Sequence, residues 1–138
     1  MICFFDTNVL VYCMDAGDPQ RQARAIACFA QACEQDTVVV SAQVLQEFYA
    51  ITTRKLHPPL SGAEAQAQIE RLASFEVVGS SATSVLEATR LAQRHQLSWW
   101  DALILEAALR AQADVLFTED GQHGQRFGKL TVENPFHH

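Results

Sequence analysis

Acidic side chains directly follow two of the apolar stretches in this sequence. Asp6 comes after the apolar residues 2–5, and Glu119 and Asp120 come after residues 115–118. Each stretch has the length of a short β-strand, and the carboxyl ends of parallel strands meet at one edge of a sheet, where ligands of such folds bind. We therefore expect Asp6 and the acidic pair to share one rim of a sheet.

Two further acids lie on helices that the apolar pattern predicts. At about 100° per residue, Asp101 points into the middle of an almost wholly apolar surface, and Glu47 lies about 40° from Ile51 at the edge of an apolar face. The expected buried face of the helix with Glu47 consists of Val44, Leu45, Phe48, Tyr49 and Ile51. Simpler interpretations exist for both acids. Asp101 stands three residues after Ser98, as in a capping box, and Glu47 could pair with Arg54 on the same helix edge.

Carboxylates at one rim need a positive charge among them, because each close carboxylate raises the cost of ionising the next. None of the ten Lys and Arg residues lies beside Asp6 or Asp101 in an evident pocket. A metal ion is the better candidate, and oxygen ligands without His or Cys at ligand spacing favour magnesium or manganese over zinc. Such an ion lowers the pKa of a bound water and neutralises a phosphate, which suits hydrolysis of a phosphodiester.

Short apolar runs alternate with longer helical segments along the chain. The expected strands are residues 2–5, 37–41, 76–79, 115–118 and 130–133. These runs are apolar without alternation, as strands buried on both faces are. The pattern predicts an α/β fold, a three-layer α/β/α sandwich with a central, mostly parallel sheet of four to five strands and right-handed crossovers. We expect one domain over residues 1–136, while residues 137–138 resemble a tag remnant.

Capping residues predict where the helices begin. The expected first-turn signals are Asp18 with Pro19 for a helix to about residue 35, Ser61 with Glu64, Thr83 or Ser84, and Ser98. Ser, Thr and Asp are favoured at these positions because their side chains accept hydrogen bonds from the first free amides of a helix.

Composition limits the class of protein. The 138 residues are 49% hydrophobic, enough for one core. No run reaches the roughly 18 apolar residues of a membrane span, and the N-terminus lacks the charge of a secretory signal, so we expect a cytoplasmic protein without a membrane partner. The net charge of −6 argues against a strongly basic nucleic-acid-binding surface. Cations that neutralise four clustered carboxylates would leave about −2, which is compatible with a polyanionic substrate.

The four cysteines predict no disulfide framework. They are Cys3, Cys13, Cys28 and Cys33. None forms a CxxC pair, and we interpret them as small buried hydrophobes.

Four segments, taken in order, resemble the motifs of the PIN-domain family and, within it, the VapC-like toxins of bacterial type II toxin–antitoxin systems. These segments are FFDTN at 4–8, QVLQEF at 43–48, SWWDAL at 98–103 and LFTED at 116–120. The resemblance extends from the first strand to VENPF near the C-terminus. It implies a PIN-like fold and an endoribonuclease that depends on Mg²⁺ or Mn²⁺. The positions implied to be catalytic and to bind the metal are Asp6, Glu47, Asp101 and Asp120.

The same resemblance implies supporting residues and partners. Thr118 matches a hydroxyl that lines the site, and Thr7 and Asn8 complete the first motif. The pattern leaves open whether Glu119 or Asp120 faces the metal, and the motif alignment favours Asp120. The family also implies a homodimer, an RNA substrate, and an antitoxin protein whose tail lies in a groove, often with a basic residue that reaches the acidic site.

RNA binding by an acidic protein must use the few basic residues near the rim. The candidates for phosphate contacts are Arg54, Lys55, Arg126 and Lys129. Ordinary solvated charges are the simpler interpretation for each of them. Trp99 is expected to be the more exposed tryptophan and a candidate for contact with RNA or a partner, whereas Trp100 is expected in the core. His123 could act as an acid or contact phosphate, although a surface histidine is the simpler interpretation.

Three other classes of protein compete with the nuclease. A haloacid-dehalogenase-like phosphatase requires a second Asp two residues after the first, where this chain has Asn8. A response-regulator receiver domain requires an Asp at the end of its third strand, and residues 76–81 contain none. A catalytically idle PIN-like module would bind RNA or a partner only, and a nuclease assay with metal and chelator distinguishes it.

Overall fold

The computed structural model describes residues 1–137, which form an α/β fold with a six-stranded sheet. The strands are β1 (Ile2–Phe5), β2 (Thr37–Ser41), β3 (Glu76–Val78), β4 (Val115–Phe117), β5 (Arg126–Phe127) and β6 (Leu130–Glu133). The helices are α1 (Thr7–Tyr12), α2 (Pro19–Gln35), α3 (Ala42–Thr52), α4 (Gly62–Leu72), α5 (Ala82–His95) and α6 (Trp99–Arg110). The strand order is β3-β2-β1-β4-β6-β5, and every pairing except β5 with β6 is parallel.

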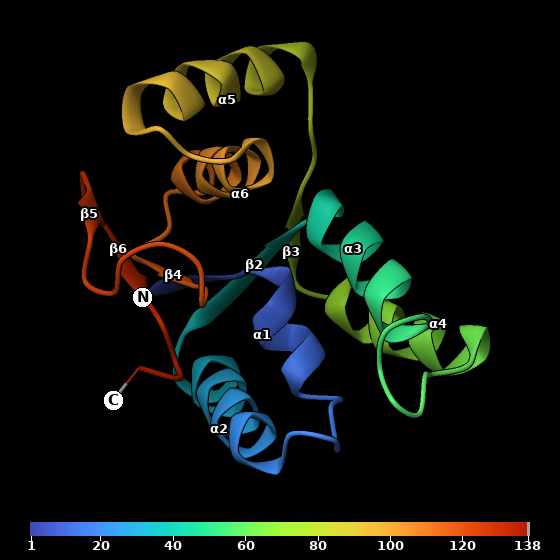
Figure 1. Ribbon diagram of the computed structural model, residues 1–138. Helices are drawn as coiled ribbons and strands as arrows, with labels where there is room; N and C mark the ends of the chain where they lie inside the picture. Colours follow the sequence, from blue (N-terminus) through green and yellow to red (C-terminus); the bar gives the residue numbers. More distant parts are fainter. Residues whose placement is uncertain (138) are drawn as a thin grey trace.

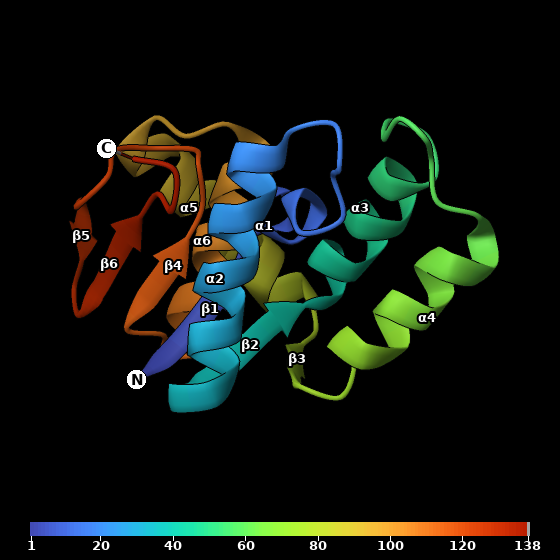
Figure 2. The same cartoon turned by 90° about the horizontal axis from the view of Figure 1, so that it is seen from below.

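Helices cover both faces of this sheet. In Figure 1, α5 and α6 lie above it, α1 and α2 lie below it, and α3 and α4 stand beyond the β3 edge. Figure 2, from below, shows α2 running across β1 and β2. The predicted three-layer fold with a mostly parallel sheet is therefore confirmed.

The sheet differs from the prediction at its edge. All five predicted strands occur, but the two-residue strand β5 adds a sixth that pairs antiparallel with β6 through Arg126–Thr131 and Phe127–Leu130. So short a strand has too few residues to show a period, which is why the apolar pattern did not reveal it. The short helix α1 was also not predicted, because it follows Asp6 without a loop.

The central strands are buried on both faces, as their continuous apolar runs predicted. Phe4, Phe5, Val39 and Val40 are fully buried. The ring of Phe5 packs on Phe117 of β4 and edge-on against Phe29 of α2, which ties the sheet to the layer below. A rigid pair of strands, β1 and β4, thus ends side by side at Phe5 and Phe117.

Helix caps follow the predicted chemistry with one correction. Asp18, Ser61 and Ser98 are N-caps as expected. The helix α5, however, is capped by Ser81 and not by Thr83 or Ser84, because Ser81 and Ser84 exchange hydrogen bonds in a reciprocal capping box.

Two predictions about burial are also corrected. Tyr49 is 45% exposed, since the buried positions of α3 are Val44, Phe48 and Thr52, spaced four apart. Within the described residues all four cysteines are free, but only Cys3 is fully buried and Cys33 is exposed.

None of the helices in the described part of the chain is long and apolar enough to cross a membrane.

Candidate active site

Asp6 is held rigidly where β1 passes into α1. It is the N-cap of α1, and its carboxylate accepts hydrogen bonds from the amide of Thr7 (2.7 Å) and from Oγ1 of Thr118 (2.8 Å). Thr118 follows β4 directly, so the two adjacent strand ends supply both groups. Burial, and to a smaller extent the carboxylates of Asp120 and Glu47, raise the pKa of Asp6 to about 6, although both hydrogen bonds oppose that shift.

Glu47 faces the same edge of the sheet from α3. Its Oε1 accepts a hydrogen bond from Nε2 of Gln43 at 2.9 Å and one from Oγ1 of Thr7 at 3.4 Å. Within residues 1–137 it forms no ion pair with Arg54, so the simpler interpretation of Glu47 is wrong. Gln43 was not predicted as a residue of the site. Its position four residues before Glu47 on one helix does indicate a hydrogen bond between the two side chains.

Asp101 does not serve as the acidic half of a capping box. Ser98 caps α6 by accepting from the Asp101 amide at 3.2 Å, but among the described residues the Asp101 carboxylate accepts no hydrogen bond. In α4, at the same spacing, the Glu64 carboxylate does return to the Ser61 amide at 2.9 Å. The Asp101 carboxylate is therefore left free to face the pocket beside it.

The structure separates the two neighbouring acids of the last motif. Asp120 lines the same pocket as Asp6 and Asp101, and burial followed by the charge of Asp101 raises its pKa. Glu119 turns the other way and accepts a hydrogen bond from the Tyr12 hydroxyl at 3.4 Å. The Asp120 amide donates to Oγ1 of Thr118 at 3.0 Å, which fixes this turn of the loop.

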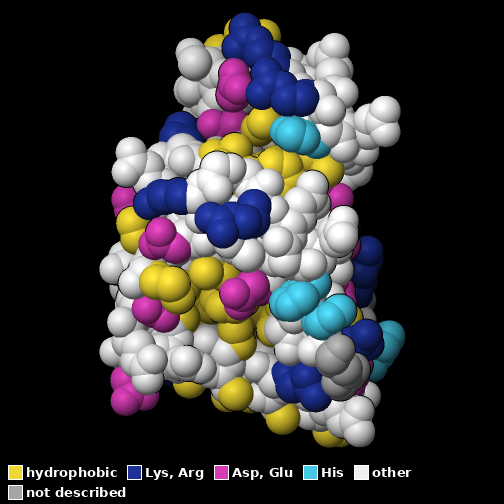
Figure 3. Space-filling model, turned by 90° about the vertical axis from the view of Figure 1, so that its left-hand side faces the viewer, with side chains coloured by type: hydrophobic (Ala, Val, Ile, Leu, Met, Phe, Trp, Pro, Cys, Tyr) yellow, Lys and Arg dark blue, Asp and Glu magenta, His cyan; other side chains and the backbone are white. Residues whose placement is uncertain are grey.

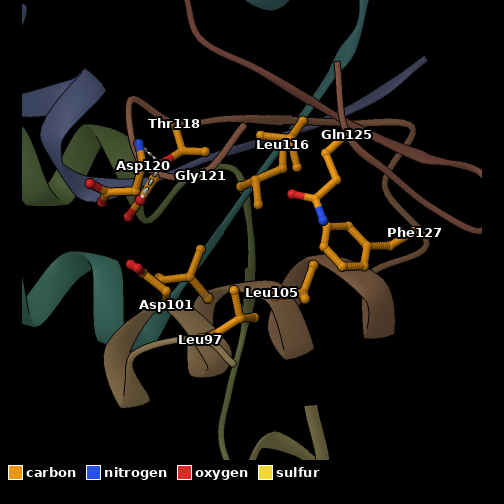
Figure 4. Close-up of a pocket in the computed structure, with 12 residues that line it drawn as sticks. Leu97, Asp101, Leu105, Leu116, Thr118, Asp120, Gly121, Gln125 and Phe127 are labelled. Carbon is orange, nitrogen blue, oxygen red and sulfur yellow. Dashed lines mark hydrogen bonds between the residues drawn. The ribbon is translucent and has the colours of Figure 1, made fainter. Parts of the chain in front are cut away.

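All four predicted carboxylates meet in one pocket of about 140 Å³. Its lining consists of Asp6, Thr7, Asn8, Gln43, Glu47, Trp100, Asp101, Ile104 and Asp120. A narrower pocket of about 50 Å³ continues from Asp6, Asp101 and Asp120 between α6 and β4. Figure 4 shows Asp101, Thr118 and Asp120 at one end of it, and Leu105, Gln125 and Phe127 toward the other.

The donor set of the carboxylate pocket fits a hard cation. Every side chain that could bind a metal there offers oxygen, and no Lys or Arg from the described part of the chain lines the pocket. Burial is the main cause of the raised pKa of Asp6, and the carboxylates of Asp120 and Glu47 add to it. Within residues 1–137, no three His, Cys, Asp or Glu side chains are already arranged to hold one ion.

The basic residues predicted to contact RNA lie elsewhere. Arg54 and Lys55 follow the far end of α3, and the seven residues from Glu47 to Arg54 correspond to about 10 Å of helix. Lys129 lies 3.5 Å from Asp114, which precedes β4, so the β5–β6 hairpin carries it to the opposite edge of the sheet. Arg126 is exposed on β5 and lines neither pocket of the site.

The charges on the β5 side of the molecule are also mixed. Figure 3 shows basic and acidic side chains interspersed on that face, without a single-sign basic surface. Lys129 therefore lies away from the acidic rim, beside Asp114, whereas phosphate contacts by Arg54, Lys55 and Arg126 stay a prediction.

The two tryptophans are exposed in the reverse order of the prediction. Trp100 is 62% exposed and Trp99 is 38% exposed. Helical periodicity predicted that Trp100 is buried. Trp100 instead lies in the first turn of α6, where it lines a pocket beside the start of α3. His123 is exposed, and its Nδ1 accepts from the Asn134 amide at 3.0 Å, away from the carboxylates.

A mostly parallel sheet with helices on both faces and an acidic pocket at its carboxyl edge defines the class of the protein. It is an α/β fold of the kind in which ligands bind beyond the carboxyl ends of the strands. Residues 3–127 match the family model of the PIN domain, and the chain belongs to the PIN-domain family. The resemblance in the sequence motifs is thereby confirmed, and the phosphatase and receiver-domain alternatives are excluded.

Solved structures of toxin–antitoxin proteins share this fold. The chain is 20% identical to VapBC2 from Rickettsia felis bound to a promoter DNA fragment, over 97% of this chain and 98% of that one, with a TM-score of 0.68. VapBC-1 from nontypeable Haemophilus influenzae matches at 20% identity over 98% of both chains, with a TM-score of 0.66.

A third similar structure is VapC20 from Mycobacterium tuberculosis, described as a toxin that cleaves the sarcin–ricin loop. It is 20% identical, covers 83% of this chain and 86% of that chain, and has a TM-score of 0.66. At these identities the likeness is one of fold. A search of curated proteins found no match to this chain.

Proposed function

We propose that this protein is a metal-dependent endoribonuclease that hydrolyses RNA phosphodiester bonds, and that it is the toxin of a toxin–antitoxin pair. The observation that carries the proposal is the pocket in which four carboxylates from four separate segments converge, with no basic side chain of residues 1–137 in its lining. Membership of the PIN-domain family and the likeness in fold to VapC20, which is described as a toxin that cleaves the sarcin–ricin loop, support it.

The proposed roles follow from the hydrogen bonds of each side chain. Asp6, Glu47, Asp101 and Asp120 would hold Mg²⁺ or Mn²⁺, which supplies charge neutralisation at the phosphate and a more acidic water. Thr7 and Thr118 orient the Asp6 carboxylate, and Gln43 orients that of Glu47. Asn8 lines the same pocket, and Glu119 anchors the loop through Tyr12.

The Asp101 carboxylate is the best candidate to accept a proton in this site. It accepts no hydrogen bond from the described residues, and it faces Asp120, whose pKa is raised by burial and, to a smaller extent, by the charge of Asp101. A carboxylate without fixed donors is available to a water molecule beside the substrate.

An antitoxin and a second copy of the chain are the proposed protein partners. An acidic pocket without its own basic residue suits a Lys or Arg side chain from a partner, which would compete with the cation. The VapBC structures that share this fold are complexes by their names, and this supports an antitoxin partner.

The experiment that tests the function is a cleavage assay on defined RNAs with magnesium, manganese or a chelator. We expect cleavage with either ion, none with chelator, and none from Asp101→Asn. Cleavage that survives thorough removal of metal contradicts the metal-dependent mechanism. A wild-type protein that binds RNA but never cleaves it favours the idle RNA-binding module.

A further inference from the structure

Trp100 is an unusually exposed aromatic residue beside the carboxylates. The residue is 62% exposed, although burial of so large an apolar ring would stabilise the fold. It directly precedes Asp101, so the Cα atoms of the two residues are about 3.8 Å apart. Both side chains line the carboxylate pocket, so a ligand in that pocket can contact the indole ring.

Trp100 also separates two pockets. On one side it lines the carboxylate pocket, together with Glu47 and Asp101. On the other it lines a pocket of about 340 Å³, bounded by the start of α3, the end of β3 and the first turn of α6. The ring is the shared wall between the acidic site and this larger space.

Polar and apolar side chains both line the larger pocket. The polar ones include Gln43 and Gln46 of α3, Ser80, and the ion-paired Glu106 and Arg110 of α6. Val78 and Leu103 are among the residues that supply apolar surface. Amides and hydroxyls both donate and accept hydrogen bonds, which suits ribose hydroxyls and the edges of bases, and the apolar surface suits the face of a base.

We propose that Trp100 is a substrate-binding residue on which one RNA base next to the cleaved phosphodiester stacks, and that the following nucleotide enters the pocket of Gln46 and Ser80. This inference rests on the proposed nuclease function and specifies its substrate. A base can lie on the indole only when it has left its own helix, so the enzyme cleaves unpaired RNA. Stacking on the indole does not depend on the identity of the base, because every base has a π-face.

Intrinsic fluorescence tests this proposal directly, because the chain has only two tryptophans. Trp99→Phe leaves Trp100 as the sole fluorophore, and Trp100→Phe is the matched control that reports Trp99. Both are made in the Asp120→Asn background so that the RNA survives. The probes are a six-nucleotide oligouridylate and an abasic ribose-phosphate chain of the same length.

We expect the oligouridylate to quench Trp100 at least twofold, the abasic chain to leave it unchanged, and Trp99 to respond much less. Trp100→Ala should weaken binding of the oligouridylate about 5- to 150-fold, which corresponds to 1–3 kcal/mol per stacked base, and Trp100→Phe should restore most of it. Because Trp100 is exposed, neither variant removes a core contact.

Each other outcome overturns the inference in a distinguishable way. If RNA is bound and cleaved while Trp100 emission and the affinity of Trp100→Ala are unchanged, the stacking role is wrong and the nuclease function stands. If the emission of Trp100 shifts to the blue as the protein concentration rises without RNA, and sedimentation shows dimers, the ring binds a second copy of the chain instead of RNA. If the wild type neither binds nor cleaves RNA, both proposals are wrong.

Discussion

At the scale of single residues, neighbouring acids with opposite surroundings give the sharpest test of the site. Asp120→Asn should reduce RNA cleavage by more than about 100-fold, beyond the 10- to 100-fold loss typical of residues that only support metal ligands. Glu119→Gln is the matched control, because the Glu119 side chain turns toward Tyr12. This variant should cleave RNA within about threefold of the wild-type rate. Initial rates on one RNA at saturating magnesium measure both, and equal losses would contradict the proposed division of roles.

The buried Asp6 predicts a pH dependence of stability in the absence of metal. Its folded-state pKa is raised from 3.8 to about 6, mainly by burial, so its stabilising contribution is complete below about pH 4 and is lost as the pH rises through 6. Between pH 5 and pH 7.5, wild type should lose roughly 1 kcal/mol relative to Asp6→Asn. Urea unfolding with chelator at both pH values measures this, and parallel pH profiles would show that Asp6 ionises normally.

At the scale of elements, the cap of α6 sets the position of Asp101. Ser98→Ala removes the acceptor for the Asp101 amide and should cost about 1 kcal/mol of unfolding free energy. Ser61→Ala removes the equivalent cap of α4, far from the carboxylates, and should cost about the same. Only Ser98→Ala should also slow RNA cleavage. Urea denaturation and cleavage rates compare the two, and identical cleavage would show that the cap does not position Asp101.

The sequence predicted those elements whose signals are local. Continuous apolar runs such as residues 37–41 identified buried strands, and the carboxyl ends of β1 and β4 predicted that Asp6 and Asp120 converge. Helical periodicity did not predict the exposure of Trp100, because a periodic pattern assumes a neighbour on every apolar face. The position of Lys129 depended on a hairpin that reverses the chain at Gly128 and Lys129; Gly128 marks the turn, but the two-residue strand before it is too short to show a period.

At the scale of the whole molecule, the carboxylate pocket should couple metal binding to stability. Without metal, Asp101→Asn should be as stable as wild type or more so, since it removes one charge from a crowded cluster. At an Mg²⁺ concentration of 100 times Kd, wild type should gain about 2.7 kcal/mol, and the variant should gain less. Thermal melts with and without magnesium measure both differences. Equal gains would mean that Asp101 does not bind the ion.

The position of β1 in the sheet has a consequence for synthesis of the protein. β1 lies between β2 and β4, and the latter begins only at Val115. A nascent chain that ends at Arg110 contains Asp6, Glu47 and Asp101 but lacks the neighbouring strand, Thr118 and Asp120. Domains generally fold as units once their segments have emerged from the ribosome. If the protein cleaves RNA as proposed, an unfinished copy is therefore harmless to the ribosome and messenger that are producing it.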